Sequence, residues 1–476
     1  MKCHVCEKPN RDKAIFCKWC GEKIATKANA PLRELTGMTK VKDRLNDLMN
    51  TCESIKKREA ATGTKIRLGM DMIITGNTGT GKSELVGSIA KLLANCGIIT
   101  PGKIKVVDAV DYNDFAEEWD KNIAAIKGGV LCVENAQKLV PAGISDDIYV
   151  LDKLFSSMNK WSNDPIVIIS GLKTGLEEFF AANPDIAGRF EYRFDLGDFT
   201  AEEILEITER KLSSKYGLSI DSEAKAKLLR IIKNEIRKNI DEFGNGHWAA
   251  KKAEEIFSYA IKRDSSGVEA TACDVRGEEF VVKSLDEIMK ELDSFVGVDE
   301  IRECVLKIIN KIEIDKERKG GDAKREIKDH FLFLGNPGTG KTTIARIFAD
   351  ILCSLEVLPL GHLVEVSRKD LVAGYVGQTA IDVERCVNRA MGGILFIDEA
   401  YSLKNGDNDQ FGQEAIDTLL KLVEDNRGKL VAIAAGYTKE MNEFLSANSG
   451  MESRFNETIN FRDYSAEELT EISEEW

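Results

Sequence analysis

The sequence predicts an α/β fold with two tandem units, each a parallel sheet flanked by helices and followed by a helical lid, plus a small cysteine-bearing N-terminal module. Two observations predict this arrangement. Apolar runs such as 70–75 and 331–334 lead directly into glycine-rich loops, and helical patterns follow those loops. The same series of motifs recurs in the second half of the chain, in one order and at nearly equal spacing. We interpret the chain as a tandem duplication.

Composition and charge narrow the class of protein. The length of 476 residues suits about three domains, and 43% hydrophobic with 31% charged residues is an ordinary globular balance. A net charge of -14 argues against nucleic acid as the main partner, because binding a phosphate backbone needs a basic surface. No apolar run is long enough to span a membrane and no signal-peptide core is present, so we expect a cytoplasmic protein without membrane insertion.

Among the 11 cysteines, a group near the N-terminus forms two Cys-x-x-Cys pairs. This spacing is typical of two knuckles that converge on one tetrahedral Zn²⁺ with four thiolate ligands. The alternative is a redox pair, but the thioredoxin-like βαβ pattern that such a pair needs is absent. We interpret His4 as a bystander, because four sulfurs already complete the site. The predicted zinc ligands are Cys3, Cys6, Cys17 and Cys20.

Two loops fit the phosphate-binding pattern G-x-x-x-x-G-K-[ST]. In such loops, backbone N–H groups and a helix N-terminus hold nucleotide phosphates, so we expect ATP to bind at both. In the second loop Lys341 would reach the β- and γ-phosphate oxygens, and Thr342 would ligate Mg²⁺. The predicted nucleotide-binding residues are Gly76, Asn77, Thr78, Gly79, Thr80, Gly81, Lys82, Ser83 and Glu84 in the first copy, and Gly335, Asn336, Pro337, Gly338, Thr339, Gly340, Lys341, Thr342 and Thr343 in the second.

In the second copy, a later strand pattern at 394–397 ends in an acidic pair. Asp398 would hold Mg²⁺ through its water shell. Glu399 would orient and deprotonate the attacking water, because hydrolysis needs a carboxylate at that place. Lys341 and Glu399 are therefore predicted catalytic residues of an ATPase.

The first copy has a different pair at the corresponding place. Matching the alanine and leucine that follow the pair in both copies aligns Glu134 with Asp398 and Asn135 with Glu399. An asparagine amide cannot take a proton from water at neutral pH. Sliding the alignment by one residue would make Glu134 the base, but it would leave Val133 at the Mg²⁺ position. We predict that the first unit binds ATP with impaired hydrolysis.

A helical region of lid size follows the first core, but its counterpart in the second copy is almost wholly missing. We interpret the chain as a fragment; the alternative is a second unit without a standard lid. The predicted segments are a zinc ribbon at 1–25, a degenerate first core at 26–198, its lid at 199–275, a complete second core at 285–465 and the start of a truncated lid at 466–476.

The second copy resembles the CbxX/CfxQ family of AAA+ ATPases. The resemblance rests on GNPGTGKTT (335–343), GYVGQTA (374–380), IDEAY (397–401) and AGY (435–437), with the lead-in ELDSFVG (291–297). It is strong over about 285–476 and weak over about 32–275. The family includes red-type Rubisco activases, stage V sporulation protein K and the ATPase of type VII secretion systems.

This resemblance implies a homo-oligomeric ring, usually hexameric, that pulls a protein client through a central pore. Tyr375 and Val376 match the family's pore loop and would contact the client; the alternative for Tyr375 is an ordinary buried aromatic residue. Arg454 occupies the arginine-finger position, which reaches the γ-phosphate of ATP in the neighbouring subunit. Its alternative is a surface ion pair. Tyr437 stands where other AAA+ proteins place a polar sensor, and no role is assigned to it.

The first copy lacks two further family features. No Gly-Tyr-Val-Gly segment occurs in it, and His247 and Ala250 fall where the family's sensor segment usually has arginines. We therefore expect a platform for binding and assembly in the first unit, and one working motor in the second. The leading hypothesis is an ATP-driven protein remodeller. The alternatives are a nucleic-acid motor or loader that uses the zinc ribbon, and a nucleotide-gated scaffold with little hydrolysis.

Overall fold

The computed structural model describes residues 30–474, except 34, 65–68, 112–118, 140–164, 174, 177–179, 181–187, 189, 240–242, 319–326, 374–377, 407–408 and 448. The chain forms two compact units. The first consists of Met1–Ile232 with Phe243–Arg276, and the second of Lys233–Glu242 with Gly277–Trp476. Each unit is an α/β structure with a parallel sheet, as the sequence predicts.

The sheet of the first unit contains five parallel strands in the order β2-β3-β4-β1-β5. The central strands are almost wholly buried, which explains why their sequences are continuous apolar runs rather than alternating patterns. The strands are β1 (Met72–Gly76), β2 (Ile104–Asp108), β3 (Val130–Glu134), β4 (Ile166–Gly171) and β5 (Tyr192–Leu196).

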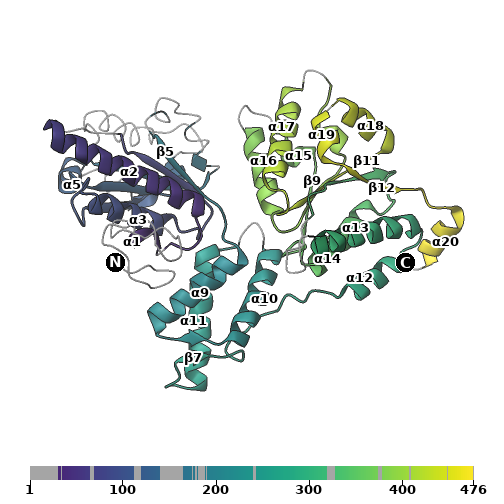
Figure 1. Ribbon diagram of the computed structural model, residues 1–476, viewed down its shortest axis with the longest axis horizontal. Helices are drawn as coiled ribbons and strands as arrows, with labels where there is room; N and C mark the ends of the chain where they lie inside the picture. Colours follow the sequence, from purple (N-terminus) through teal and green to yellow (C-terminus); the bar gives the residue numbers. More distant parts are fainter. Residues whose placement is uncertain are drawn as a thin grey trace. The chain divides into compact units, whose positions relative to one another are not determined.

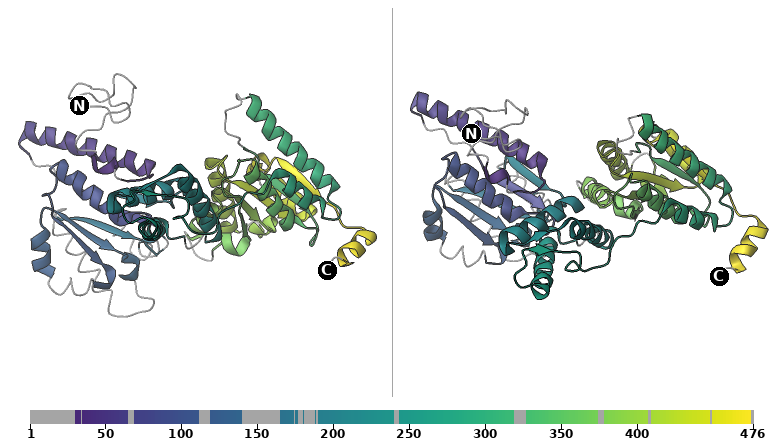
Figure 2. Two further views of the ribbon diagram at one scale, coloured as in Figure 1. Left: turned by 90° about the horizontal axis from the view of Figure 1, so that it is seen from below. Right: turned by 60° about the horizontal axis from the view of Figure 1, so that its bottom comes forward.

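Helices α2 (Thr39–Thr62) and α3 (Lys82–Asn95) cover one face of this sheet (Figures 1 and 2). Their buried stripes, including Leu45 and Leu85, pack against the inward side chains of β1 and β3 in one hydrophobic cluster. Shorter elements complete the described part of this core: α1 (Ala30–Arg33), η2 (Ala109–Asp111), α5 (Trp119–Ile126) and η3 (Ala136–Leu139).

The first core is followed by helices α9 (Ala201–Tyr216), α10 (Ser222–Lys238) and α11 (Asn245–Arg263), of which α10 begins in the first unit and ends in the second. A capping box between Thr200 and Glu203 begins α9, and Gly217 in the left-handed conformation ends it. Tyr216 stacks on Phe257 of α11, with ring centroids 4.3 Å apart. The short parallel strands β6 (Ser219–Ile220) and β7 (Glu269–Ala270) pair beside these helices.

The sheet of the second unit has the order β9-β10-β11-β8-β12, so corresponding strands occupy the same places as in the first sheet. All its neighbouring strands are parallel. The strands are β8 (Phe331–Gly335), β9 (Leu363–Val366), β10 (Ile394–Ile397), β11 (Val431–Gly436) and β12 (Glu457–Phe461).

Alternate residues of these strands point to two separate hydrophobic clusters. On one face, Phe331 and Phe333 pack with α12 (Leu285–Asp293), α13 (Asp299–Arg318) and α14 (Lys341–Ser354). On the other face, Leu332 and Leu334 pack with the remaining main helices (Figure 1). These helices are α16 (Gln378–Arg389), α17 (Gln410–Asp425) and α18 (Thr438–Ala447).

Shorter elements fill the second unit: α15 (Arg368–Leu371), η4 (Ala400–Leu403), α19 (Ser449–Arg454) and α20 (Ala466–Glu474). Among the helices that the structure describes, none is both long enough and apolar enough to cross a membrane.

Candidate functional site

The phosphate-binding loop of the second unit joins the end of β8 to the start of α14. Gly338 and Gly340 have φ of 75° and 85°, a left-handed conformation that glycine adopts without steric cost, and the helix begins at Lys341. Lys341 Nζ donates to the carbonyl oxygens of Gly335 and Asn336, at 2.8 and 2.7 Å. The loop thus curls around the ammonium at the N-terminus of a helix that is 14 residues long.

The first unit repeats this loop almost atom for atom. Gly79 and Gly81 have φ of 77° and 88°, and Lys82 Nζ donates to Gly76 O and Asn77 O, also at 2.8 and 2.7 Å. Thr80 Oγ1 donates to Asn77 O at 2.8 Å. The two loops therefore share one conformation, and the difference between the units lies elsewhere.

An aspartate that the sequence analysis missed holds each loop from the side. Asn336 Nδ2 donates to both carboxylate oxygens of Asp463 at 2.9 Å, and Asn77 Nδ2 donates to Asp198 Oδ2 at 2.9 Å. Both aspartates lie just after the strand that pairs with the loop's own strand. Each aspartate stands nine residues after an arginine, Arg454 in the second copy and Arg189 in the first, and this recurrence was the signal that could have identified them.

The acidic pair of the second unit lies at the end of β10. Asp398 N donates to Val366 O, and Glu399 N donates to Asp398 Oδ1 at 3.0 Å. Glu399 has φ 47° and ψ 47°, a left-handed conformation that is uncommon for a residue with a long side chain. The Glu399 side chain is exposed, and Asp398 is half-buried.

The structure aligns the acidic pair with its counterpart in the first unit. Asn135 also has a left-handed backbone, with φ 55°, and a 3-10 turn follows it as one follows Glu399. The strand registers agree, because Val130 of β3 and Ile394 of β10 take the same place in the two sheets. Asn135 therefore stands where Glu399 stands, and the alternative alignment that shifts Glu134 into that place does not fit the backbone.

The electrostatics of the two lysines support the same alignment. Burial lowers the pKa of Lys341, and the nearby Asp398 carboxylate opposes this effect. Burial likewise lowers the pKa of Lys82, which Glu134 opposes. Asp398 and Glu134 thus face the corresponding ammonium groups. In the second unit the glycine turns, Lys341 and Thr342 follow β8, and Asp398 follows β10, so these residues lie at the same end of the parallel sheet and suit a magnesium nucleotide.

Asn135 has a partner that Glu399 lacks in the second sheet. Its Nδ2 donates to Asp108 Oδ2 at 2.5 Å, and Asp108 is the last residue of β2. In the second sheet the corresponding position, just after β9, is Ser367. The first unit therefore places a carboxylate on the neighbouring strand and an amide at the position that the Glu399 carboxylate takes in the second unit.

The start of α11 contacts the phosphate-binding loop within the first unit. Gly246 N donates to Gly79 O at 2.9 Å, and Asn245 Nδ2 donates to Thr78 O at 3.2 Å. A Cβ on Gly79 would lie 3.0 Å from His247 Cδ2. The segment around His247, which resembles the sensor segment of the CbxX/CfxQ family, therefore lies beside the loop. It has the His247 imidazole at a position where that family usually has an arginine.

Arg454 lies at the other end of the second sheet from the phosphate-binding loop. Glu457, which follows it, pairs with Phe331 at the start of β8, whereas the loop begins at Gly335, at the end of that strand. Arg454 Nε lies 3.6 Å from Glu424 Oε2, and Arg454 Nη1 donates to Gly450 O at 3.2 Å.

The remaining predicted site residues lie outside the residues that the structure describes. They are Tyr375 and Val376 of the expected pore loop and the expected zinc ligands Cys3, Cys6, Cys17 and Cys20. Within the described ranges, histidine, cysteine and carboxylate side chains form no cluster of three or more that could hold a metal ion.

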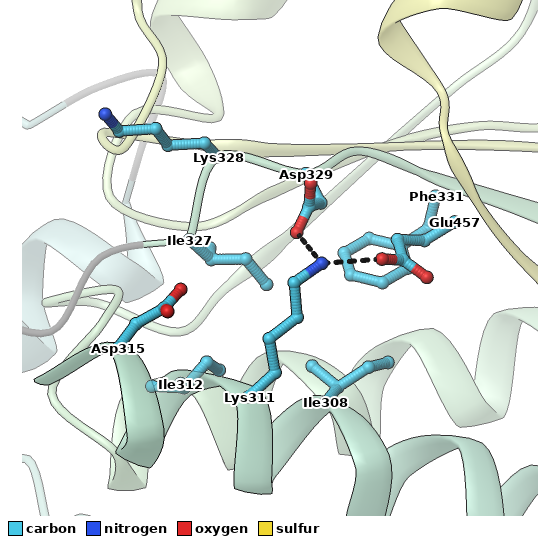
Figure 3. Close-up of a pocket in the computed structure, with 9 residues that line it drawn as sticks. All are labelled: Ile308, Lys311, Ile312, Asp315, Ile327, Lys328, Asp329, Phe331 and Glu457. Atoms are coloured by element: carbon cyan, nitrogen blue, oxygen red, sulfur yellow. Dashed lines mark hydrogen bonds and ion pairs between the residues drawn. The ribbon is translucent and has the colours of Figure 1, made fainter. Parts of the chain in front are cut away.

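A cavity of about 280 Å³ opens in the second unit, close to Lys311 (Figure 3). Lys311 Nζ donates to Asp329 Oδ2 and Glu457 Oε1, at 2.8 and 2.7 Å. The cavity is lined by Phe331, so it lies at the beginning of β8 and is separate from the phosphate-binding loop.

Comparison with known families matches residues 331–463 to the ATPase family associated with various cellular activities (AAA). The chain is 45% identical over 190 residues to stage V sporulation protein K of Bacillus subtilis, covering 40% of the chain and 59% of that protein. It is 43% identical over 206 residues to protein CbbX of Cereibacter sphaeroides, covering 43% and 66%. It is 44% identical over 195 residues to ESX-1 secretion system protein EccA1 of Mycolicibacterium smegmatis, covering 40% and 34%.

The chain thus spans between about a third and two thirds of the length of these relatives. The matched family region contains the loop of β8, the acidic pair after β10 and Arg454. Residues 331–463 therefore belong to the AAA family of ATPases, and the chain resembles the CbxX/CfxQ-type members of that family.

Proposed function

We propose that the chain is an ATP-driven protein remodeller with two tandem AAA+ modules, in which the second hydrolyses ATP and the first binds nucleotide mainly for assembly. The observation that carries this proposal is the comparison of Asn135 with Glu399, which follow β3 and β10, the third strand of each unit. Glu399 and Asn135 share a backbone conformation and a place in the sheet, and they differ in the one group that general-base catalysis requires.

In the second unit, the loop's N–H groups and Lys341 would bind the phosphates, while Thr342 and Asp398 would hold Mg²⁺. The ion supplies charge neutralisation between the β- and γ-phosphate oxygens when it is bound. Glu399 accepts a proton from the attacking water and orients it. Its carboxylate can do so because Glu399 directly follows Asp398, the proposed Mg²⁺ ligand, and its side chain is exposed to the solvent that supplies the water.

In the first unit, the loop conformation, Lys82 and Ser83 support nucleotide binding. The amide of Asn135 cannot act as a base, and its bond to Asp108 fixes it in place. Nucleotide there would be a structural ligand that joins the core to the start of α11, since Gly246 and Asn245 contact the same loop.

A protein client fits the resemblance better than nucleic acid does. The net charge of -14 disfavours a phosphate backbone, and one similar protein bears the name of a secretion-system component. We propose a homo-oligomeric, hexameric ring in the cytoplasm, with Tyr375 and Val376 contacting the client and Arg454 acting on the next subunit. The N-terminal cysteines would hold one structural Zn²⁺.

Replacing the base tests the proposal directly. Glu399→Gln should retain ATP binding and lose at least about 100-fold in turnover, the usual scale of a general base. Glu440→Gln, an exposed glutamate on α18 of the same unit, is the matched control and should retain activity. If Glu399→Gln kept half of the turnover, the assignment of the motor to the second unit would be wrong.

Glu399→Gln and the unmodified protein together separate the protein remodeller from the nucleic-acid motor and the scaffold. As a substrate trap it should retain a protein client that can be identified by mass spectrometry. Turnover of the unmodified chain that is stimulated by DNA and not by protein would favour the nucleic-acid motor. Negligible turnover of the unmodified protein in its full length would favour the scaffold.

A further inference from the structure

Tyr401 follows Glu399 by two residues and packs against Tyr437, and the proposed function gives neither tyrosine a role. Tyr401 stacks on Tyr437, with ring centroids 5.5 Å apart and an interplanar angle of 28°. The Tyr401 hydroxyl also lies close enough to the Glu399 carboxylate and to the Tyr437 hydroxyl for both groups to act on its pKa. Burial, the Glu399 carboxylate and the Tyr437 hydroxyl together raise the pKa of Tyr401 to about 12, so its hydroxyl stays protonated and remains a hydrogen-bond donor.

The backbone is arranged to admit the Tyr401 ring. Tyr401 lies in η4, immediately after the left-handed turn at Glu399, and Gly436 is the last residue of β11. A Cβ on Gly436 would lie 2.8 Å from Tyr401 Cδ1, so glycine is needed for the ring to approach the strand. The ring is thereby held between the end of β11 and Tyr437.

The first unit provides an internal comparison. The strand registers align Gln137 with Tyr401 and Leu172 with Tyr437. Gln137 occupies the same space, because a Cβ on Gly171 would lie 2.1 Å from its Oε1. There Gln137 Oε1 accepts from Leu172 N at 3.3 Å. The unit that lost the carboxylate therefore also lacks both hydroxyls, although the packing of the turn is retained.

We propose that Tyr401 is a positioning residue that holds the Glu399 carboxylate where it can take a proton from the attacking water, and that Tyr437 holds Tyr401. This inference rests on the proposed hydrolysis in the second unit. Glu399 is exposed, and an exposed glutamate loses conformational freedom whenever its carboxylate is fixed. A hydroxyl whose ring is held by stacking on Tyr437 would restrict the carboxylate in advance, as productive geometry at a reacting centre requires.

Removing single hydroxyl groups from the full chain tests the proposal. Tyr401→Phe and Tyr437→Phe keep the rings and their stacking, so the fold should persist with an unchanged Tm. Tyr401→Phe should lower kcat by about 10-fold or more while KM for ATP stays within about threefold, since a misplaced catalytic group costs rate on this scale. Tyr437→Phe should give a smaller fall, because it acts through Tyr401. Tyr216→Phe, a half-buried tyrosine stacked on Phe257, is the control.

Comparing Glu399→Gln with Tyr401→Phe separates a wrong positioning role for Tyr401 from a wrong assignment of Glu399 as the base. If Glu399→Gln remains active, the base itself is misassigned. If Glu399→Gln is inactive but Tyr401→Phe keeps kcat within twofold, only the positioning role is wrong. A fall in kcat accompanied by an equal loss of nucleotide affinity or by a lower Tm would also overturn the proposal, because it would show that the hydroxyl supports the fold.

Discussion

Asn135 and Glu399 share a left-handed backbone conformation, with φ of 55° and 47°, at the ends of equivalent strands. Asparagine tolerates this conformation better than glutamate does. The first unit thus has the residue that the backbone prefers, and the second has the residue that the proposed hydrolysis requires. A residue such as Glu399, held in a backbone conformation that its side chain disfavours, is typical of functional sites.

We predict that Asn135→Glu does not restore hydrolysis to the first unit. The new carboxylate would face Asp108, which now accepts from the Asn135 amide at 2.5 Å. Two ionised carboxylates in contact repel each other. Urea unfolding at pH 7 should show the first unit destabilised by about 1–3 kcal/mol.

Adding Asp108→Ser, which places a serine as Ser367 does in the second unit, should recover most of that stability. Turnover is measured in a Glu399→Gln background, so that only the first unit contributes. Full stability of the single variant at pH 7 would show that the two side chains do not face each other.

We predict an acid-dependent loss of stability at Asp409. Arg368 donates to Asp409 Oδ2 at 2.8 Å, and this pairing with the backbone donors of Asn405 and Gly412 lowers the pKa of Asp409 to about 2. A carboxyl group whose pKa is depressed in the folded state stabilises that state above its unfolded pKa of about 4. The stabilisation is lost as the pH falls from about 4 through about 2.

Asp409→Asn should therefore cost about 1–3 kcal/mol of unfolding free energy at pH 7, and the difference from the unmodified protein should shrink towards pH 2. Unfolding curves measured across this pH range check it. Asp425→Asn, at the other end of α17, should show no comparable pH dependence if the Arg368 contact is the cause. A difference that stays constant from pH 7 to pH 2 would contradict the assignment.

Much of the fold could be predicted from the sequence because its signals are local. Buried strands are continuous apolar runs, and the phosphate-binding loop combines glycines at fixed positions with a lysine at the helix start. The alignment of Asn135 with Glu399 was predicted from neighbouring residues and is confirmed by the backbone and the strand registers.

The contacts across the sheet edge could not be predicted in this way. Asp463 reaches Asn336, and Tyr437 reaches Tyr401, only because strands distant in sequence end side by side. The Asp108 bond likewise depends on the register between β2 and β3. A single sequence carries no direct signal of such contacts.

We predict one Zn²⁺ per chain at Cys3, Cys6, Cys17 and Cys20. Four thiolates complete a tetrahedral structural site, so each ligand is needed. Metal analysis of the purified protein under reducing, zinc-supplied conditions should give one equivalent, and Cys17→Ser should lose it. Cys273→Ser, an exposed cysteine of the first unit, is the control. Absence of zinc from the unmodified protein would refute the site.

Tyr375 should couple hydrolysis to client movement. It stands 34 residues after Lys341 in the sequence, outside the phosphate-binding motif. Tyr375→Ala should keep basal ATP hydrolysis within a few-fold of normal while client remodelling fails, and Tyr375→Phe should keep both, because an aromatic ring is sufficient for grip. Loss of nucleotide binding in Tyr375→Ala would indicate an ordinary core aromatic residue instead.

Arg454 should act on ATP bound by a neighbouring subunit. Within its own subunit it ends α19, just before β12 begins, and the phosphate-binding loop lies at the end of the adjacent β8. The four residue steps of that strand alone separate them by roughly 13 Å. A guanidinium at the γ-phosphate is worth about 10³–10⁵ in rate in P-loop enzymes. Arg454→Ala should therefore keep ATP affinity and lose turnover.

Mixing two inactive variants tests this arrangement. Subunits with Arg454→Ala retain an intact Glu399, and subunits with Glu399→Gln retain an intact Arg454. If both groups meet at each subunit interface, mixed assemblies should recover part of the activity that each variant lacks alone. Glu424→Gln, which removes the ion-pair partner 3.6 Å from Arg454 Nε, should change turnover less than Arg454→Ala does. Mixed assemblies that demonstrably form and stay inactive would show that Arg454 is not the finger, because an intact pair would then be present without effect.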